Sequence, residues 1–203
     1  MRNIAVILAG GIGARVGGNT PKQLLPLSDG HSVLEHAVNA FEQSPHIHEI
    51  CIVMHPDYIM HAEQMLLANA WQKVYHIIPG GKERWESSVN AIRLYQDKLE
   101  PAQFANANIL LHDAARPFVS QRIISDVCEA LKEHEAVVVA IPSTDTVYEM
   151  QNGCVARIPN RSTIMRAQTP QAFRLPLITK AYDIALNSEN MQVIRNSVGS
   201  HRV

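Results

Sequence analysis

The chain has 203 residues, 46% hydrophobic and 18% charged, as expected of one globular domain with its own core. Its formal net charge is −1, so no overall positive field draws it to nucleic acid or acidic lipid. Because it has three cysteines without a CxxC pair, no signal-peptide pattern and no apolar run near the ~20 residues of a membrane span, we expect a cytoplasmic protein that binds no membrane.

Apolar runs and helical periods alternate along most of the chain. The first run, at 4–8, is apolar throughout, which is typical of a strand covered on both faces. Such alternation predicts a Rossmann-like α/β fold, a doubly wound and mostly parallel sheet that binds ligands beyond the carboxyl ends of its strands. Further strands are expected at 49–54, 74–78, 108–112 and 136–141, and helices at 32–43, 58–71, 84–95 and 121–133.

The segment at about 143–166 breaks this alternation. Strand-like residues 146–150 and 154–158 flank Asn152-Gly153, a pair that tolerates the positive φ of a tight turn, so a protruding β-hairpin arm is expected. A two-stranded hairpin alone is marginally stable in water. The arm must therefore pack on the rest of the chain or on a second subunit. Since no repeat or linker divides the sequence, we predict a single domain, 1–203, that carries this arm.

Glycines follow the first strand directly. Gly10 and Gly11 allow backbone N–H groups to approach an anion closely, and Arg15 and Lys22 add two cations. This composition predicts a triphosphate site, with a purely structural turn as the alternative. Two better-known glycine loops do not fit, because the P-loop pattern GxxxxGK[ST] is absent and Val16 occupies the third glycine position of the dinucleotide fingerprint.

The string LAGGIGARVGGNTPKQ resembles the signature of the nucleotidyltransferases that make sugar nucleotides. Further motifs follow it in order: Gly80-Gly81-Lys82-Glu83-Arg84 with Ser87-Ser88, His112-Asp113-Ala114-Ala115-Arg116-Pro117-Phe118, Asp145-Thr146, Arg161, and Gln168-Thr169-Pro170-Gln171-Ala172-Phe173. Over about residues 3–180, this ordered set resembles the cytidylyltransferases that act on 2-C-methyl-D-erythritol 4-phosphate and on ribitol 5-phosphate.

The resemblance implies a nucleotidyltransferase fold that transfers a cytidylyl group from CTP to a polyol phosphate and releases pyrophosphate. Arg15 and Lys22 would clamp the phosphates electrostatically. Asp113 would bind Mg²⁺, which prefers carboxylate and phosphate oxygens. The residues expected to contact the nucleotide follow the first and third strands: Ala9, Gly10, Gly11, Gly81 and Ser87.

On the acceptor side, the resemblance implies Arg116, Thr146 and Arg161. The last two lie at the roots of the arm. In this family the arm reaches across a dimer, so the resemblance implies a homodimer in which Thr146 and Arg161 serve the neighbouring site. A homodimer would also give the hairpin the packing partner that it needs.

Two acceptors remain open. Tyr148 and Asn160 stand where methylerythritol enzymes usually have Lys and Asp, and Ile158-Pro159-Asn160-Arg161 is closer to the ribitol-phosphate enzymes. In contrast, the two alanines after Asp113 are typical of the methylerythritol enzymes. The balance favours ribitol 5-phosphate.

The sequence departs from the family pattern from about residue 190. Family members reach an Asn-x-Lys-x-Thr motif whose lysine helps to bind the acceptor phosphate, whereas here no lysine follows Lys180. We therefore expect a truncated or altered C-terminal segment. The alternatives are a nucleotidyltransferase for another sugar phosphate or base, and an inactive relative that binds CTP or only dimerises.

Overall fold

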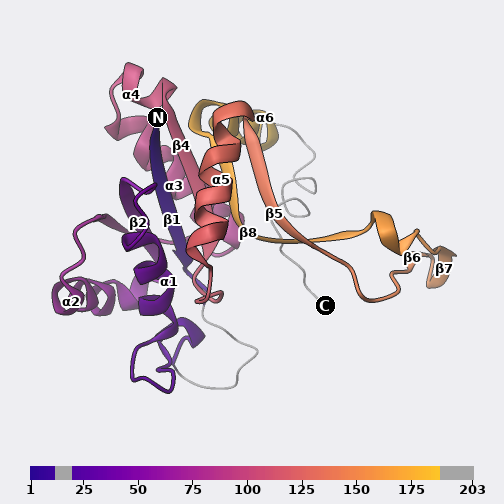
Figure 1. The fold of residues 1–203 in the computed structure, drawn as a ribbon, viewed down its shortest axis with the longest axis horizontal. Helices are drawn as coiled ribbons and strands as arrows, with labels where there is room; N and C mark the ends of the chain where they lie inside the picture. The colour runs from indigo at the N-terminus through magenta and orange to yellow at the C-terminus, as the bar shows by residue number, and fades with distance from the viewer. Residues whose placement is uncertain (12–19, 188–203) are drawn as a thin grey trace.

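A six-stranded sheet with helices on both faces forms the body of the protein (Figure 1). The computed structural model describes residues 1–11 and 20–187. The strands of this sheet are β1 (Arg2–Ala9), β2 (Glu49–Met54), β3 (Val74–Pro79), β4 (Ala107–Asp113), β5 (Ala136–Pro142) and β8 (Met165–Arg174). The helices are α1 (Val33–Glu42), α2 (Ile59–Asn69), α3 (Arg84–Lys98), α4 (Pro101–Ala105), α5 (Gln121–Glu133) and α6 (Leu175–Leu186).

The strand order is β3-β2-β1-β4-β8-β5. Strands β3, β2, β1 and β4 pair in parallel, whereas β8 is antiparallel to both of its neighbours, β4 and β5. The predicted doubly wound, mostly parallel sheet is therefore confirmed. Because all four parallel strands end on one edge, the segments after β1, β3 and β4 come together there.

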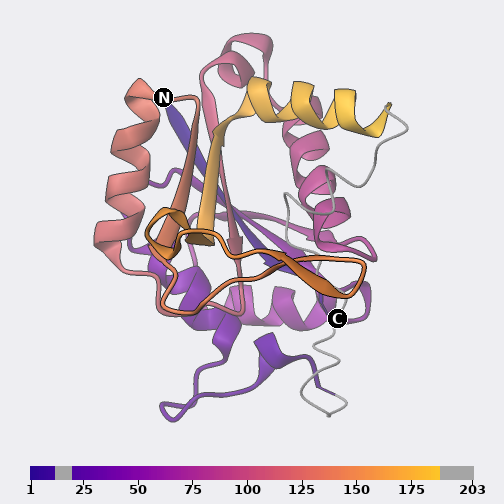
Figure 2. The ribbon, with the colours of Figure 1, turned by 90° about the vertical axis from the view of Figure 1, so that its right-hand side faces the viewer.

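Each central strand is buried on both faces, as its continuous apolar sequence predicts. In β1, Ala5 and Ile7 join a core shared with α1, α2 and α5, while Ile4 and Val6 join a second core shared with α3 and α6. Figure 2 shows α5 and α6 on opposite sides of the sheet. A fully buried Ile contributes about 1.5–3 kcal/mol, so the two cores fix β1 firmly and hold its carboxyl end in place.

A capping box fixes the start of α1. The Ser32 hydroxyl accepts from the Glu35 N–H at 3.2 Å, and the Glu35 carboxylate accepts from the Ser32 N–H at 2.6 Å. The Val33 N–H also donates to the Leu25 carbonyl at 3.1 Å. The segment from Thr20 to His31 is thereby tied to the helix that follows it, and it returns the short 3₁₀ turn η1 (Lys22–Leu24) to the end of β1.

The cysteines at 51 and 128 are buried free thiols, and burial raises the pKa of Cys128 to about 11. Among the helices within 1–11 and 20–187, none combines the length and hydropathy that crossing a bilayer requires.

The arm leaves the body between β5 and β8 and projects away from it (Figure 1). Its strands β6 (Glu149–Gln151) and β7 (Cys154–Arg157) pair antiparallel around Asn152 and Gly153, whose φ angles of 51° and 79° suit a tight turn. The hairpin is confirmed. The expected strand at 146–150 is wrong in its first half, since β6 begins at Glu149. The register of this exposed pair also shifts between Glu149 and Met150.

Candidate active site

The carboxyl ends of β1 and β4, together with the start of α3, surround a cavity of about 550 Å³. Most of the residues predicted from the sequence to form the site line it: Ala9, Gly10, Gly11, Lys22, Gly81, Ser87, Asp113 and Arg116. Arg15 lies outside the described residues. Thr146 and Arg161 lie on the arm and do not line this cavity.

Glycines bring the segments after β1 and β3 into contact. A methyl group on Gly10 would lie 3.0 Å from the Ser87 Oγ, and one on Gly80 would lie 3.1 Å from the Gly10 Cα. A methyl group on Gly81 would lie 2.2 Å from the Glu86 Cβ. Only glycine allows backbone to approach this closely, so these positions form a wall built mostly of main chain.

Ser87, in the first turns of α3, binds the main chain of that wall. Its side chain is buried, and its Oγ accepts from the Gly81 N–H at 3.1 Å. Glu83 precedes the first turn of α3 and forms a capping box with Glu86. The 15-residue helix α3 thus presents its N-terminus, the positive end of its dipole, at the border of the cavity.

Lys22 and Gln23 form another side of the cavity. Lys22 is exposed at the start of η1, whereas Gln23 is buried beside it. The Gln23 amide nitrogen donates to the carbonyl oxygens of Ala9 at 2.6 Å and Gly11 at 2.7 Å. Gln23 is the last residue of the LAGGIGARVGGNTPKQ string, but the sequence alone indicates no role for its side chain.

Asp113 is paired with two arginines at the end of β4. Its carboxylate lies 2.7 Å from the Arg84 Nε and 3.6 Å from the Arg116 Nε. Arg116 also donates to the Gln168 side-chain oxygen. The Asp113 carboxylate thereby fixes two guanidinium groups, which suit phosphate oxygens in charge and shape.

Arg84 lines the cavity, although the sequence assigns it no role beyond its place in the motif at 80–84. Its guanidinium lies against Asp113. A basic residue in the first turn of a helix, directly after strand-end glycines, was the available signal. The lining residues include more basic than acidic side chains: Lys22, Lys82, Arg84 and Arg116, against Glu83 and Asp113.

His112 supports this turn from inside the protein. Its side chain is fully buried, and burial lowers its pKa to about 4, so the ring is neutral. Its Nε2 lies 3.0 Å from the Arg116 carbonyl oxygen, which can only accept, so Nε2 carries the proton. Its Nδ1 then accepts from the Thr169 hydroxyl at 3.1 Å, while that hydroxyl accepts from the Asp113 N–H at 3.3 Å. This network connects β8 to the turn at 113–116.

The donor set fits a magnesium ion that arrives with a substrate. Across the described residues, no group of three or more His, Cys, Asp or Glu side chains converges to hold a metal alone. Asp113 supplies one carboxylate to the cavity. Mg²⁺ is commonly bound by one or two carboxylates together with substrate phosphates, which this arrangement allows.

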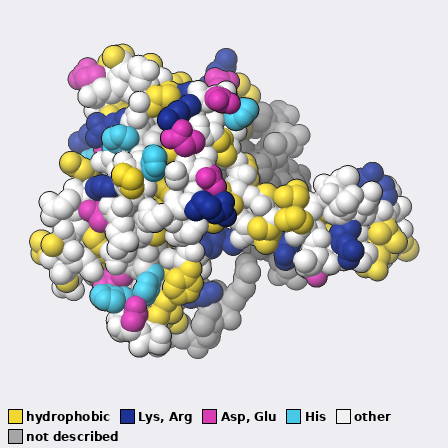
Figure 3. Space-filling view, in the orientation of Figure 1, with side chains coloured by type: hydrophobic (Ala, Val, Ile, Leu, Met, Phe, Trp, Pro, Cys, Tyr) yellow, Lys and Arg dark blue, Asp and Glu magenta, His cyan; other side chains and the backbone are white. Residues whose placement is uncertain are grey.

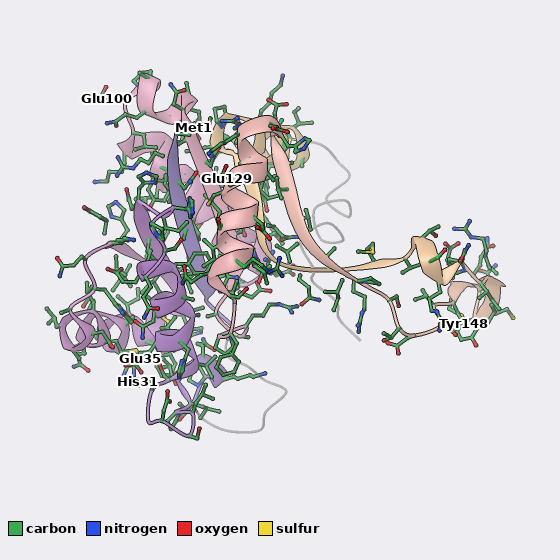
Figure 4. All side chains as sticks on the ribbon, in the orientation of Figure 1. Met1, His31, Glu35, Glu100, Glu129 and Tyr148 are labelled. Carbon is green, nitrogen blue, oxygen red and sulfur yellow. The ribbon has the colours of Figure 1, made fainter. Side chains whose placement is uncertain are left out.

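The acceptor residues predicted on the arm stand apart from the cavity. Arg161 begins the short turn η3 (Arg161–Thr163), and its Nη1 donates to the Thr144 carbonyl at 3.4 Å. Tyr148, labelled in Figure 4, lies near the outer end of the arm. Within one chain, the structure therefore groups the predicted nucleotide side of the site and separates it from Thr146 and Arg161.

Known proteins match nearly the whole chain. The sequence profile of IspD, 2-C-methyl-D-erythritol 4-phosphate cytidylyltransferase, matches residues 3–197. The enzyme of that name from Thermobifida fusca is 41% identical over 186 residues, 89% of this chain and 72% of the relative. The ribitol-5-phosphate cytidylyltransferase of Lactiplantibacillus plantarum is 34% identical over 194 residues, 95% of this chain and 82% of the relative. The bifunctional ribulose 5-phosphate reductase/CDP-ribitol pyrophosphorylase Bcs1 of Haemophilus influenzae is 40% identical over 185 residues, and this chain spans only 38% of its length.

Solved structures agree with these sequence matches. The 4-diphosphocytidyl-2C-methyl-D-erythritol synthase of Anaerococcus prevotii has a TM-score of 0.76 and 28% identity to this chain, over 93% of this chain and 76% of that one. The expected departure from the family near residue 190 falls on residues outside the described part of the structure. On the matched length and the shared fold, the chain belongs to the IspD cytidylyltransferase family.

Proposed function

We propose that this protein transfers a cytidylyl group from CTP to a polyol phosphate and releases pyrophosphate. One observation supports this most directly: in a member of a cytidylyltransferase family, Lys22, Arg84 and Arg116 surround one cavity with the glycine segments after β1 and β3. A cavity of about 550 Å³ is in the range of nucleotide-sized ligands.

The chemistry requires no nucleophilic side chain. An oxygen of the acceptor phosphate attacks the α-phosphorus of CTP, and the bond from that phosphorus to the oxygen shared with the β-phosphate breaks. The electron pair leaves with pyrophosphate. Catalysis then consists of aligning the two phosphates and stabilising negative charge, which are the roles we propose for Lys22, Arg84 and the predicted Arg15. Backbone groups of Ala9 to Gly11 and the Gly81 turn would hold the nucleotide.

We propose Asp113 as the protein ligand of Mg²⁺, with phosphate oxygens of CTP completing the site. The ion would neutralise charge on the phosphates as the leaving group departs. Arg84 and Arg116 already neutralise Asp113 in this structure, so the carboxylate is held in position before any substrate arrives.

We also propose that the arm packs against a second copy of the chain. Five large apolar side chains of the arm are between 38% and 59% exposed: Val147, Tyr148, Met150, Val155 and Ile158. Figure 3 shows hydrophobic surface on the arm. Exposed apolar surface on a hairpin that would be marginal alone calls for a partner. In a homodimer of this kind, Thr146 and Arg161 would complete the acceptor side of the neighbouring cavity.

The buried thiols at 51 and 128 suit the reducing cytoplasm, where we place the reaction.

The acceptor we favour is ribitol 5-phosphate, on the evidence of Tyr148 and Asn160. The testing experiment is pyrophosphate release from CTP and Mg²⁺, with ribitol 5-phosphate and 2-C-methyl-D-erythritol 4-phosphate in parallel and UTP, GTP and ATP as controls. Release with CTP and ribitol 5-phosphate supports the proposal. Release only with the methylerythritol acceptor reassigns the substrate, and release only with another nucleotide reassigns the base. CTP binding without release from either acceptor identifies an inactive relative.

A further inference from the structure

The Gln23 side chain is directed at the main chain of the glycine loop. Only 6% of this residue is exposed, and its amide nitrogen donates to the carbonyl oxygens of Ala9 and Gly11, at 2.6 Å and 2.7 Å. A side-chain amide nitrogen carries two protons, so these two bonds use both. Gln23 therefore has no amide proton left for a ligand, although it lines the cavity.

These two bonds constrain the peptide groups that would face the nucleotide. In a trans peptide, the carbonyl of one residue and the N–H of the next point in opposite directions. Fixing the Ala9 carbonyl on Gln23 turns the Gly10 N–H to the opposite side. Gly10 also lies close to the segment after β3, since a methyl group on it would lie 3.0 Å from the Ser87 Oγ and 3.5 Å from the Gly80 Cα.

The loop needs such a constraint because glycine has the widest choice of backbone conformations. Two adjacent glycines can rotate the peptide between them at little cost, and an anion site requires one orientation of its N–H groups. The two Gln23 bonds hold the peptide groups on either side of that peptide. Gln23 itself is held firmly. It follows Lys22 in η1, and the next residue, Leu24, is buried in the core shared with α1.

We propose that Gln23 is a positioning residue, which orients the backbone of Ala9 to Gly11 toward the phosphates of CTP. This inference rests on the proposed function and assigns a task to a residue whose amide protons are both donated to the main chain. Because Lys22 and Gln23 are adjacent, the turn η1 would determine both the position of the Lys22 cation and the orientation of the loop N–H groups.

The test compares Gln23→Met with Gln121→Met in the full chain. Methionine matches the length of glutamine but donates no hydrogen bond, so two carbonyls lose their partner. Gln121 is a matched control, since its Nε2 also donates to a carbonyl oxygen, that of Ala40 at 2.6 Å, but it does not line the cavity. The measurements are the Kd of CTP with Mg²⁺ by calorimetry, the KM of each substrate, and the Tm.

For Gln23→Met we expect the Kd and KM of CTP to rise about tenfold or more, with the acceptor KM within about threefold of wild type. Gln121→Met should leave both substrates unaffected. Unchanged CTP affinity in Gln23→Met, or a parallel loss for both substrates, overturns the inference. Failure of the wild-type chain to bind CTP would instead overturn the proposed function.

If Gln23→Met does not fold, Gln23→Glu provides the second test. A carboxylate would face two carbonyl oxygens, and only its protonated form can donate to one of them. We expect its CTP affinity, relative to wild type at each pH, to recover as the pH falls from about 8 to about 6. A relative affinity that does not change with pH contradicts the positioning role.

Discussion

The cavity and the arm are stabilised in different ways. Around the cavity, the polar side chains of Gln23, Ser87 and His112 are buried and hydrogen-bonded within the chain. On the arm, β6 and β7 pair with each other and with no other strand of the described residues, and all of their residues are exposed. A site preorganised by buried hydrogen bonds needs no partner to keep its shape, whereas an exposed hairpin does.

The difference is consistent with the division of labour that we propose. In that proposal one chain builds the nucleotide side, and the arm of a second chain completes the acceptor side. The two regions nevertheless meet at β8, which continues from the arm and carries Thr169 and Gln168 to the turn at 113–116. A variant in the cavity should therefore impair the site of its own subunit, whereas a variant in the arm should impair the site of the partner subunit.

The largest effect is expected for Lys22→Ala. The side chain is exposed and lines the cavity, so its loss should leave the Tm unchanged while turnover falls about 100- to 1000-fold. Steady-state pyrophosphate release measures this change. Lys180→Ala, which removes an exposed lysine outside this cavity, is the control. A near-wild-type rate for Lys22→Ala would remove Lys22 from the mechanism.

Mixing two inactive variants tests the division between subunits. Lys22→Ala damages a cavity and leaves the arm intact, whereas Arg161→Ala damages an arm and leaves the cavity intact. After unfolding and refolding together in equal amounts, about half of the dimers are mixed and each holds one complete site, so about a quarter of wild-type activity should return. Activity that stays at the sum of the two single variants would place Arg161 in its own subunit's site or outside the mechanism.

Asp113→Asn separates a metal role from a purely structural one. If Asp113 binds Mg²⁺, the concentration of Mg²⁺ needed for half-maximal rate should rise about tenfold or more. If the carboxylate only fixes Arg84, the KM of CTP should rise at every Mg²⁺ concentration, with the Mg²⁺ dependence unchanged. A magnesium titration at several CTP concentrations distinguishes the two results.

The sequence predicts the regular parts of the fold well because local patterns determine them. The apolar run at 4–8 can only be buried on both faces, the strand at 49–54 and the helix at 121–133 have the predicted limits, and Asn152-Gly153 forms the expected turn. The position of β8 between β4 and β5 could not be predicted in this way, since strand order depends on long-range pairing. For the same reason the Arg84–Asp113 pair was missed, because it joins residues 29 positions apart in sequence.

Stability below neutral pH should report on the cavity region through His112. The pKa of this buried ring is about 4 in the folded protein, below the ordinary value of 6.5, so folding favours the neutral form. Its contribution to the free energy of unfolding is complete above about pH 6.5 and is lost as the pH falls toward 4, an effect on the order of 2–3 kcal/mol. Urea unfolding at pH 7, 5.5 and 4 measures it. His112→Gln should be less stable at pH 7 and should lose less stability over this range. An equal pH dependence in the variant would assign the effect to other groups.

The smallest effect is expected at the tip of the arm. Gly153 has a φ of 79°, where alanine is strained by about 1 kcal/mol, but a methyl group there would meet no atom within 4 Å. Gly153→Ala should therefore leave the Tm of the protein nearly unchanged and weaken dimerisation slightly, as sedimentation or light scattering would show.

Gly80→Ala is the matched variant in the cavity wall, where the added methyl would lie 2.9 Å from the Ser87 Oγ and 3.1 Å from the Gly10 Cα. It should weaken CTP binding without altering the dimer, because the segments after β1 and β3 must then move apart. If Gly153→Ala weakened CTP binding as much as Gly80→Ala does, the arm would be shaping the nucleotide side as well, and the division between the two regions would not hold.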